Sequence, residues 1–335
     1  MKGQKTRVFS GVQPTGELHI GNYLGAIKRW VLQQHEKENY FCIVDMHAIT
    51  VFQEVEKLRN RTRNLAALYI AAGLDPKVST IFVQSHVSAH AECCWILNCL
   101  TPVGWLERMT QYKVKAESQK SVTTGLLDYP ILQAADILLY DANEVPVGED
   151  QKQHVELTRD IAQRFNRIYG ETFVLPNAVI PEIGARIKAL NDPSRKMSKS
   201  QAHIRDHAIR LIDTPDDTRE VIRRAVTDTD RIIRFSNEPK HAGVNNLLEI
   251  YMLITGLDRT SIEQHFSGRG YSQLKDEVAD VVIEELRPIR ERYLKLISQG
   301  SELIDILAFG ANKAKEIANP KLEQIKYKVG FMADR

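Results

Sequence analysis

Two separated stretches of the sequence carry residue types that suit the binding of a polyphosphate. In the first, a β-prone pair, Val8-Phe9, stops at Ser10-Gly11, and a glycine- and proline-containing turn leads to a helix predicted from near Asn22. A strand, a turn and a helix start present backbone N–H groups and the positive end of the helix dipole to an anion. The second stretch, Lys196–Ser200 (KMSKS), places two lysines and two serines on a loop that can close on phosphates.

Individual side chains in these stretches have defined possible roles. His19 and Asn22 lie three residues apart at the helix start, so both can reach a phosphate above it, and Gly21 lets the backbone approach a ligand without a Cβ. Lys196 and Lys199 are candidates for contacts to a polyphosphate, since their two ammonium groups can neutralise its charge. The alternative for both lysines is a solvated basic turn.

The bulk properties are those of an ordinary globular protein. The chain has 335 residues, a length that favours two domains, and 43% of them are hydrophobic and 26% charged. The formal net charge of +2 gives no overall basic surface. Local basic patches could still bind nucleic acid. No segment resembles a signal peptide or a membrane span, so we expect a cytoplasmic location. The four cysteines lack a CxxC spacing, which favours buried thiols over a metal site.

Strands and helices alternate in the first 205 residues, which predicts βαβ units and a parallel sheet. Ligands of such sheets bind at the carboxyl ends of the strands. The further strands are predicted at Tyr40–Asp45, Thr80–Gln84, Val145–Val147 and within Glu171–Pro176, and the helices at Glu54–Ala72, Ala89–Leu100, Leu106–Glu117, Asp128–Tyr140 and Asp150–Tyr169.

The remainder of the chain is predicted to be helical. Thr214 followed by Pro215 has the pattern of a helix N-cap with proline at the first helical position. Long helices are expected at Leu274–Ser298 and Ser301–Ala318. We therefore predict a Rossmann-type, doubly wound α/β catalytic domain (1–205) with the loop 196–200, a small all-helical domain (206–290), and C-terminal helices (291–335) that pack back on the first domain.

Several segments together resemble one family, the tryptophanyl-tRNA synthetases, which are class I aminoacyl-tRNA synthetases. The matching segments occur in the same order along most of the chain: Gly11–Gly16 (GVQPTG), His19–Asn22 (HIGN), Asp128–Tyr140 (DYPILQAADILLY), Val145–His154 (VPVGEDQKQH) and Lys196–Ser200. The resemblance implies activation of L-tryptophan by ATP to tryptophanyl-adenylate with release of pyrophosphate. Transfer to tRNA(Trp) with release of AMP then follows.

The resemblance implies which residues contact ATP. They are Gln13, Pro14, Thr15, Gly21, Asn22, Gly148, Glu149, Asp150, Ile187, Lys196, Met197, Ser198, Lys199 and Ser200, and Lys196, Lys199, Asn22 and His19 carry the catalytic roles. Asn22 ranks above His19, because many members of the family have another residue at the first place of that motif. Asp150 could also cap the helix that follows. Mg²⁺ is expected to arrive with the nucleotide, because no carboxylate cluster marks a site built by the protein.

Asp136 is the leading candidate for recognition of tryptophan. It lies in an otherwise apolar predicted helix, where a carboxylate is costly unless paired, so a structural acid is the alternative. A buried carboxylate can accept the indole N–H, and a site built around that bond rejects substrates that lack it. The other candidates for this pocket are Phe9, Val145 and Val147 as apolar walls, Tyr129, Gln111 and Gln151 for the ammonium and carboxylate, and His47.

Gln133 is a departure from the family, whose bacterial members commonly have methionine at this place. It shares a helix face with Asp136, so it could bind the indole, hold Asp136 or bind a water molecule.

Partners follow from the resemblance as well. Anticodon contact is expected from the helical part, which contains Arg219, Arg223, Arg224, Arg231 and Arg234 among acidic residues, although a salt-bridged solvent face is the favoured interpretation for most of them. A homodimer is implied by the resemblance alone. The alternatives are a tyrosyl-tRNA synthetase, a nucleotidylyltransferase, and a non-catalytic tRNA-binding or regulatory protein.

Overall fold

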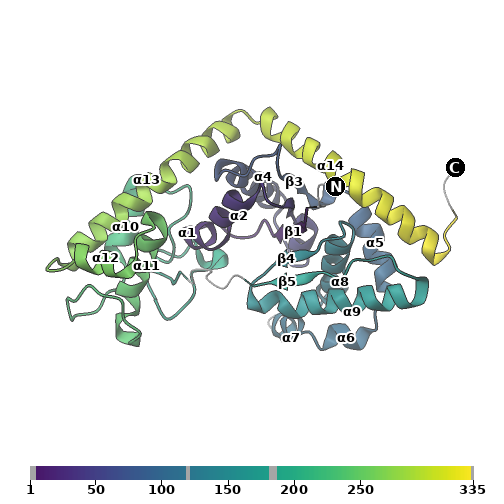
Figure 1. Cartoon of the computed structure of the whole chain (residues 1–335), viewed down its shortest axis with the longest axis horizontal. Coiled ribbons are helices and arrows are strands. Elements are labelled where there is room, and N and C mark those ends of the chain that lie inside the picture. Colours follow the sequence, from purple (N-terminus) through teal and green to yellow (C-terminus); the bar gives the residue numbers. More distant parts are fainter. Residues whose placement is uncertain (1–4, 118–120, 181–186, 333–335) are drawn as a thin grey trace.

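The computed structural model describes residues 5–117, 121–180 and 187–332. Its centre is a five-stranded, all-parallel sheet in the order β3-β2-β1-β4-β5, with helices on both faces (Figure 1). The strands are β1 (Arg7–Val12), β2 (Glu38–Ile43), β3 (Thr80–Val83), β4 (Glu144–Pro146) and β5 (Asn177–Val179). The doubly wound prediction is therefore confirmed.

The helices before residue 205 lie around this sheet. They are α1 (Ile20–Asn22), α2 (Lys28–Gln33), α3 (Asp45–Ala48), α4 (Val55–Ala71), α5 (Ala89–Asn98), α6 (Val103–Glu107), α7 (Thr110–Glu117), α8 (Thr124–Leu138) and α9 (Lys152–Tyr169). Two hydrophobic cores form on opposite faces of the sheet. One contains Phe41, Ile43 and Tyr69, and the other contains Phe9, Phe82 and Tyr140.

The order of the strands reverses between β1 and β4. The chain winds from β1 through β2 to β3 and returns to place β4 on the other side of β1. In open parallel sheets a crevice opens at this point, outside the carboxyl ends of the strands. The carboxyl ends of β1 and β4 are therefore where a ligand is expected.

The second half of the chain is helical, with α10 (Pro215–Arg224), α11 (Ala242–Thr255), α12 (Arg259–His265), α13 (Tyr271–Ser298) and α14 (Ser301–Val329). The Thr214 hydroxyl accepts from the Asp217 N–H, which confirms the predicted N-cap. In Figure 1, α13 crosses from the helical part to the α/β part, where it packs on α4, and α14 packs on β3 and α5. Gly310 of α14 permits this contact, because a Cβ there would lie 1.9 Å from the Ile81 carbonyl oxygen.

Several predicted boundaries are wrong for local reasons. The first strand does not stop at Ser10–Gly11 but continues to Val12, because its full length pairs with β2. The helix predicted at Leu106–Glu117 is two helices, α6 and α7, and the chain turns between them at Arg108. The last strand is Asn177–Val179, after the predicted Glu171–Pro176, since it pairs with β4 at that register.

Helix boundaries also differ. The helix expected from near Asn22 begins at Ile20 and passes through a π-helical turn at Tyr23–Ile27. The long helix expected from Asp150 begins with a 3₁₀ turn, and the final helix continues beyond Ala318 to Val329.

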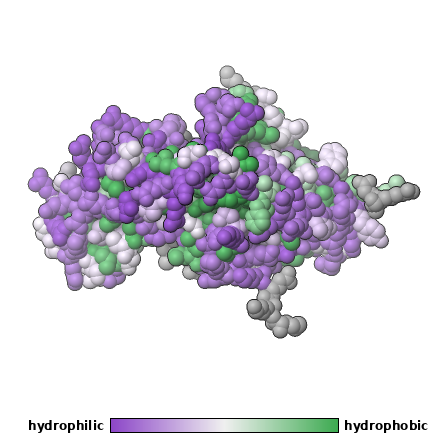
Figure 2. Space-filling view, turned by 90° about the horizontal axis from the view of Figure 1, so that it is seen from above, coloured by the Kyte–Doolittle hydropathy of each residue, from purple (hydrophilic) through white to green (hydrophobic). Residues whose placement is uncertain are grey.

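The surface is largely hydrophilic on the face shown in Figure 2, where hydrophobic residues appear between hydrophilic ones. Among the described residues, no helix combines the length and apolar character that a bilayer crossing requires.

Candidate active site

A cavity of about 560 Å³ opens at the carboxyl ends of β1 and β4, where the strand order reverses. Gly11, Val12 and Gln13 line it from the end of β1, and Val145, Pro146 and Val147 line it from the end of β4. This is the position expected for a ligand site in an open parallel sheet.

Every side chain predicted for tryptophan lines this cavity. These residues are Phe9, His47, Gln111, Tyr129, Gln133, Asp136, Val145, Val147 and Gln151. They come from β1, α3, α7, α8, β4 with the residue that follows it, and the turn before α9, so the fold brings together side chains that are distant in the sequence.

Asp136 is 1% exposed and has three hydrogen-bond donors within the protein. His47 Nε2 lies 2.8 Å from Oδ2, and His90 Nδ1 and Gln84 Nε2 lie 2.6 Å and 2.7 Å from Oδ1. Burial alone would raise the pKa of Asp136, but the bonds from the two histidines outweigh it and hold the pKa below its usual range. The cavity wall therefore contains a fixed negative charge.

Tyr129 also has a buried partner. Its hydroxyl lies 2.9 Å from His154 Nε2, and burial raises the pKa of Tyr129 to about 12, so the phenol stays protonated and its O–H can donate to His154. Burial and the nearby Lys115 lower the pKa of His154 to about 4, which suits a neutral acceptor. The oxygen lone pairs of Tyr129 therefore remain available to a ligand ammonium.

Gln133 does not hold Asp136, which was one of its predicted alternatives. It lines the cavity one turn before Asp136 on α8, but none of the donors to the carboxylate comes from it. Its amide is thus left for a ligand or a water molecule.

The predicted nucleotide residues divide into two groups. Those lining the cavity are Gln13, Thr15, Asn22, Asp150 and Lys199. Pro14 instead borders a neighbouring cavity of about 390 Å³, which shares Gln13, Thr15 and Lys199 with the first. The Asn22 side-chain oxygen accepts from the His19 backbone N–H at 3.2 Å, so its NH₂ group is the part that can donate to a phosphate.

Lys199 extends into the cavity from the loop of residues 196–200. Its Nζ donates to the Gln13 carbonyl oxygen at 3.2 Å, and burial lowers its pKa to about 8. The loop is docked on the turn after β1: Glu17 N–H bonds the Lys199 carbonyl, and a Cβ on Gly16, whose φ is +70°, would lie 2.4 Å from that oxygen. A half-desolvated ammonium beside a cavity is a site for an anion.

Other predicted nucleotide residues lie outside the lining of this cavity. Lys196 is exposed, and Ile187 and Met197 are buried and bonded to one another, the Met197 N–H donating to the Ile187 carbonyl at 3.0 Å. Gly21 packs against His19 and Ile187, Gly148 lies beside the Asp150 carboxylate, and Glu149 and Ser198 also lie outside the lining. The side chain of Ser200 lies outside the described residues.

His19 is buried rather than facing the cavity. It is 2% exposed, and neither ring nitrogen has a hydrogen-bond partner among the described residues. Burial, and then the nearby Lys199, lowers its pKa to about 3, so the ring is neutral at pH 7. Asp150 does not cap α9 as predicted: it lies inside the 3₁₀ turn Glu149–Gln151, and Gln151 occupies the N-cap position.

Sequence reasoning gave no role to four residues that complete the site. Gln84 and His90 hold Asp136, His154 holds Tyr129, and Lys115 lines the cavity with its Nζ 4.4 Å from the centre of the Tyr129 ring. Gln84 directly follows β3, so the rule that pointed to the carboxyl ends of strands could have found it. His90 follows no such rule, because its place depends on how α5 packs on α8.

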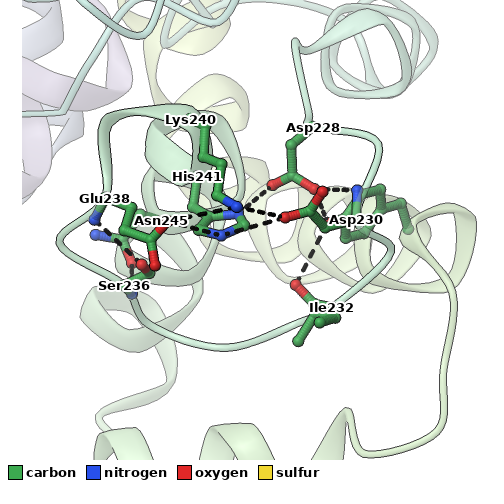
Figure 3. Close-up of polar contacts among 9 residues, drawn as sticks. Asp228, Asp230, Ile232, Ser236, Glu238, Lys240, His241 and Asn245 are labelled. Carbon is green, nitrogen blue, oxygen red and sulfur yellow. Dashed lines mark hydrogen bonds and ion pairs between the residues drawn. The ribbon is translucent and has the colours of Figure 1, made fainter.

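A second cluster of acids and histidine lies in the helical part (Figure 3). Asp228, Asp230 and His241 offer ligand atoms within 4.8 Å of one another, and they are the one such group found among the described residues. His241 Nδ1 lies 2.8 Å from Asp228, Lys240 Nζ lies 2.9 Å from Asp230, and the Tyr271 hydroxyl donates to Asp228. These carboxylates are already paired, and none of them lines the cavity.

The comparisons with known proteins agree with this geometry. Residues 1–287 match the family model described as tRNA synthetases class I (W and Y). The chain is 50% identical over 329 residues to the tryptophan–tRNA ligase of Wolinella succinogenes, covering 98% of this chain and 99% of that protein. It is 51% identical over 327 residues to the same ligase of Listeria monocytogenes serovar 1/2a, covering 98% of each.

The fold is also similar to that of a solved tryptophanyl-tRNA synthetase. The tryptophanyl-tRNA synthetase of Campylobacter jejuni, complexed with ADP and tryptophan, superposes with a TM-score of 0.86 at 37% identity, covering 97% of this chain and 100% of that one. The chain therefore belongs to the tryptophan–tRNA ligases of the class I aminoacyl-tRNA synthetases.

Proposed function

We propose that the cavity at the ends of β1 and β4 is where this tryptophan–tRNA ligase forms tryptophanyl-adenylate. The observation that carries the proposal is the buried Asp136 carboxylate in the wall of a cavity that Lys199 borders elsewhere. A fixed anion suits a substrate N–H, and an ammonium suits polyphosphate. The carboxylate and the ammonium thus match the two substrates of amino-acid activation.

Tryptophan is bound through both of its polar ends. Asp136 accepts the indole N–H, and Phe9, Val145 and Val147 supply apolar surface around the ring. Tyr129, with Gln111 and Gln151 nearby, binds the ammonium and carboxylate. Because Asp136 would otherwise keep an unused acceptor in a desolvated wall, a side chain without a matching N–H binds poorly.

ATP lies along the start of α1 and under the loop 196–200. Lys199 and the Asn22 amide contact the phosphates, and Lys196 joins them when the loop moves inward. The tryptophan carboxylate attacks the α-phosphate, the bond to the bridging oxygen breaks, and pyrophosphate leaves with its charge neutralised by the lysines. Mg²⁺ fits as an ion carried by the phosphates, because the acid cluster of the helical part does not line the cavity.

The helical segment 206–290 is proposed as the domain that contacts the anticodon of tRNA(Trp), with 291–335 belonging to the catalytic part. Among its predicted contacts, Arg219 pairs with Asp280 at 2.7 Å and Arg224 pairs with Glu220. Arg223, Arg231 and Arg234 are exposed and make no ion pair with any described residue, so they are the better candidates for phosphate contacts.

We also propose a homodimer and a cytoplasmic location. Helices α5, α6 and α7 all pack with α8, and each exposes a large apolar side chain: Trp95 is 68% exposed, Val103 57% and Val114 59%. Exposed apolar side chains on neighbouring helices suit contact with a second copy. Sedimentation of the wild type and of Trp95→Glu tests this: a dimer converted to a monomer is expected, and a wild-type monomer contradicts it.

The activation step is tested by amino-acid-dependent exchange of labelled pyrophosphate into ATP. Exchange is expected with tryptophan and not with tyrosine or phenylalanine, and it should be strongly reduced in Asp136→Ala and Lys199→Ala. Full exchange in both variants would show that the reaction uses a different cavity.

A further inference from the structure

The three donors to Asp136 divide unequally between its two oxygens. Among the described residues, Oδ1 accepts from Gln84 Nε2 and His90 Nδ1, whereas Oδ2 accepts from His47 Nε2 alone. Each carboxylate oxygen has two lone pairs. Oδ1 is therefore saturated by the protein, and the remaining lone pair belongs to Oδ2.

The orientation of Gln84 is itself determined by a second bond. Its Oε1 accepts from the Met46 backbone N–H at 3.1 Å, which leaves Nε2 to face Asp136. Met46 precedes His47 on α3, so one short helix positions a donor to each oxygen of the carboxylate. Gln84 is fully buried, so neither bond is exchanged with bulk water.

His90 is held in the same way from its other side. Its Nε2 lies 2.9 Å from the Tyr140 hydroxyl, and both residues are fully buried. Burial raises the pKa of Tyr140 well above its ordinary value, so the phenol keeps its proton and its O–H donates a hydrogen bond to Nε2. His90 then carries its own proton on Nδ1, which is the nitrogen that faces Asp136. The tautomer needed for the bond to Oδ1 follows from Tyr140.

We propose that Tyr140, His90 and Gln84 are positioning residues for substrate selection, which saturate Oδ1 of Asp136 and leave the free lone pair of Oδ2 as the acceptor of the indole N–H. This rests on the proposed function of Asp136. Without the two donors to Oδ1, the carboxylate can rotate and offer either oxygen, or turn toward other donors. Loss of these donors is then expected to lower the selectivity for a substrate with a ring N–H, while the shape of the pocket stays the same.

The test compares tryptophan with an isostere whose ring N–H is replaced by sulfur, β-(3-benzothienyl)alanine. The KM of tryptophan in the exchange of labelled pyrophosphate into ATP, and the inhibition constant of the isostere against tryptophan in the same assay, give a discrimination ratio for each variant. His90→Leu removes the donor and is expected to lower the ratio by roughly 10- to 100-fold, the usual strength of a hydrogen bond to a charged group. His90→Asn retains an N–H near the position of Nδ1 and should recover most of the ratio.

Matched variants separate the possible outcomes. His241→Leu breaks another buried histidine–aspartate pair, away from the cavity, and should leave the ratio unchanged. An unchanged ratio in His90→Leu, with a lowered ratio in Asp136→Asn, would overturn the positioning role and leave the proposed function intact. An unchanged ratio in Asp136→Asn would instead refute recognition of the N–H by Asp136.

Tyr140→Phe keeps the aromatic packing and removes only the hydroxyl. If His90→Leu does not fold, Tyr140→Phe tests whether His90 positions Asp136. A several-fold lower ratio, with thermal unfolding close to wild type, supports the chain from Tyr140 through His90 to Asp136, and an unchanged ratio contradicts it.

Discussion

The chain contains two clusters of aspartate and histidine, in which the same side-chain types have different functions. In the cavity wall, the single carboxylate of Asp136 is surrounded by two histidines and one amide. In the helical part, Asp228 and Asp230 are surrounded by His241 and Lys240 (Figure 3), and the Tyr271 hydroxyl donates to Asp228. The first cluster keeps one acceptor position unused, whereas the charges of the second are paired with one another.

The two lysines show the same contrast. Lys199 makes a bond to one backbone carbonyl, and burial lowers its pKa to about 8. Lys240 pairs with Asp230 and Glu238, and its hydrogen bonds to Asp230 and Glu238 raise its pKa. A buried polar group with an unused hydrogen-bond position can be satisfied by a ligand, whereas charged groups that pair with one another hold a loop in place. Whether a charged group has an unused bonding position, rather than its residue type, therefore distinguishes a ligand-binding residue from a structural one.

The largest expected difference is between Asp136→Ala and Asp228→Ala. Removing Asp136 leaves buried donors unpaired and removes the indole acceptor, so kcat/KM for tryptophan in pyrophosphate exchange should fall by about 10³-fold. Asp228→Ala should leave exchange unchanged and lower thermal stability. Equal losses of exchange in the two variants would contradict the distinction.

Lys199→Ala should lower kcat for exchange by roughly 10²- to 10³-fold, the range for loss of one donor to a developing charge. Lys240→Ala is the matched control and should keep the kcat of the wild type. Rapid quench measurement of adenylate formation would show whether the loss lies in the chemical step.

ATP binding should weaken with rising pH through the titration of Lys199. The pKa of about 8 belongs to the free protein, and phosphates favour the charged ammonium, so ATP binding takes up a proton above that pH. The KM for ATP should rise by up to about tenfold from about pH 7 to about pH 9. Lys199→Arg, which stays protonated, should remove this dependence. A pH-independent KM in the wild type would contradict the assignment.

The smallest effects on activity are expected in the helical cluster. His241→Leu leaves Asp228 short of a donor, so the free energy of unfolding should fall by about 1–3 kcal/mol while exchange is unchanged. Denaturant titration measures the first quantity. A stability equal to wild type would show that the cluster does not hold the loop before α11.

The sheet and most of the cavity wall follow from sequence patterns. Alternating apolar runs and helices predict the parallel sheet, and the carboxyl ends of its strands direct attention to Gln13, His47 and Val147, all of which line the cavity. Family resemblance supplied Asp136, and the structure adds that it is fully paired on one oxygen. The predicted membership of the synthetase family is confirmed.

The remainder depends on tertiary packing that no local pattern contains. His90 lies 46 positions from Asp136 and meets it only because α5 packs on α8. His19 matches a nucleotide motif, yet its ring is buried beside Gly21 and Ile187. Conversely, the exposed Lys196 belongs to a matching motif without lining the cavity, because the position of a loop depends on its tertiary contacts as well as on its sequence.

The most direct test is a crystal structure of the protein with tryptophan and a non-hydrolysable ATP analogue. The account predicts the indole nitrogen within hydrogen-bond distance of Asp136 Oδ2, about 2.7–3.2 Å, with Oδ1 still bonded to Gln84 and His90. It also predicts phosphates beside Lys199. An indole nitrogen bonded to Oδ1, or one directed away from Asp136, would contradict the central claim.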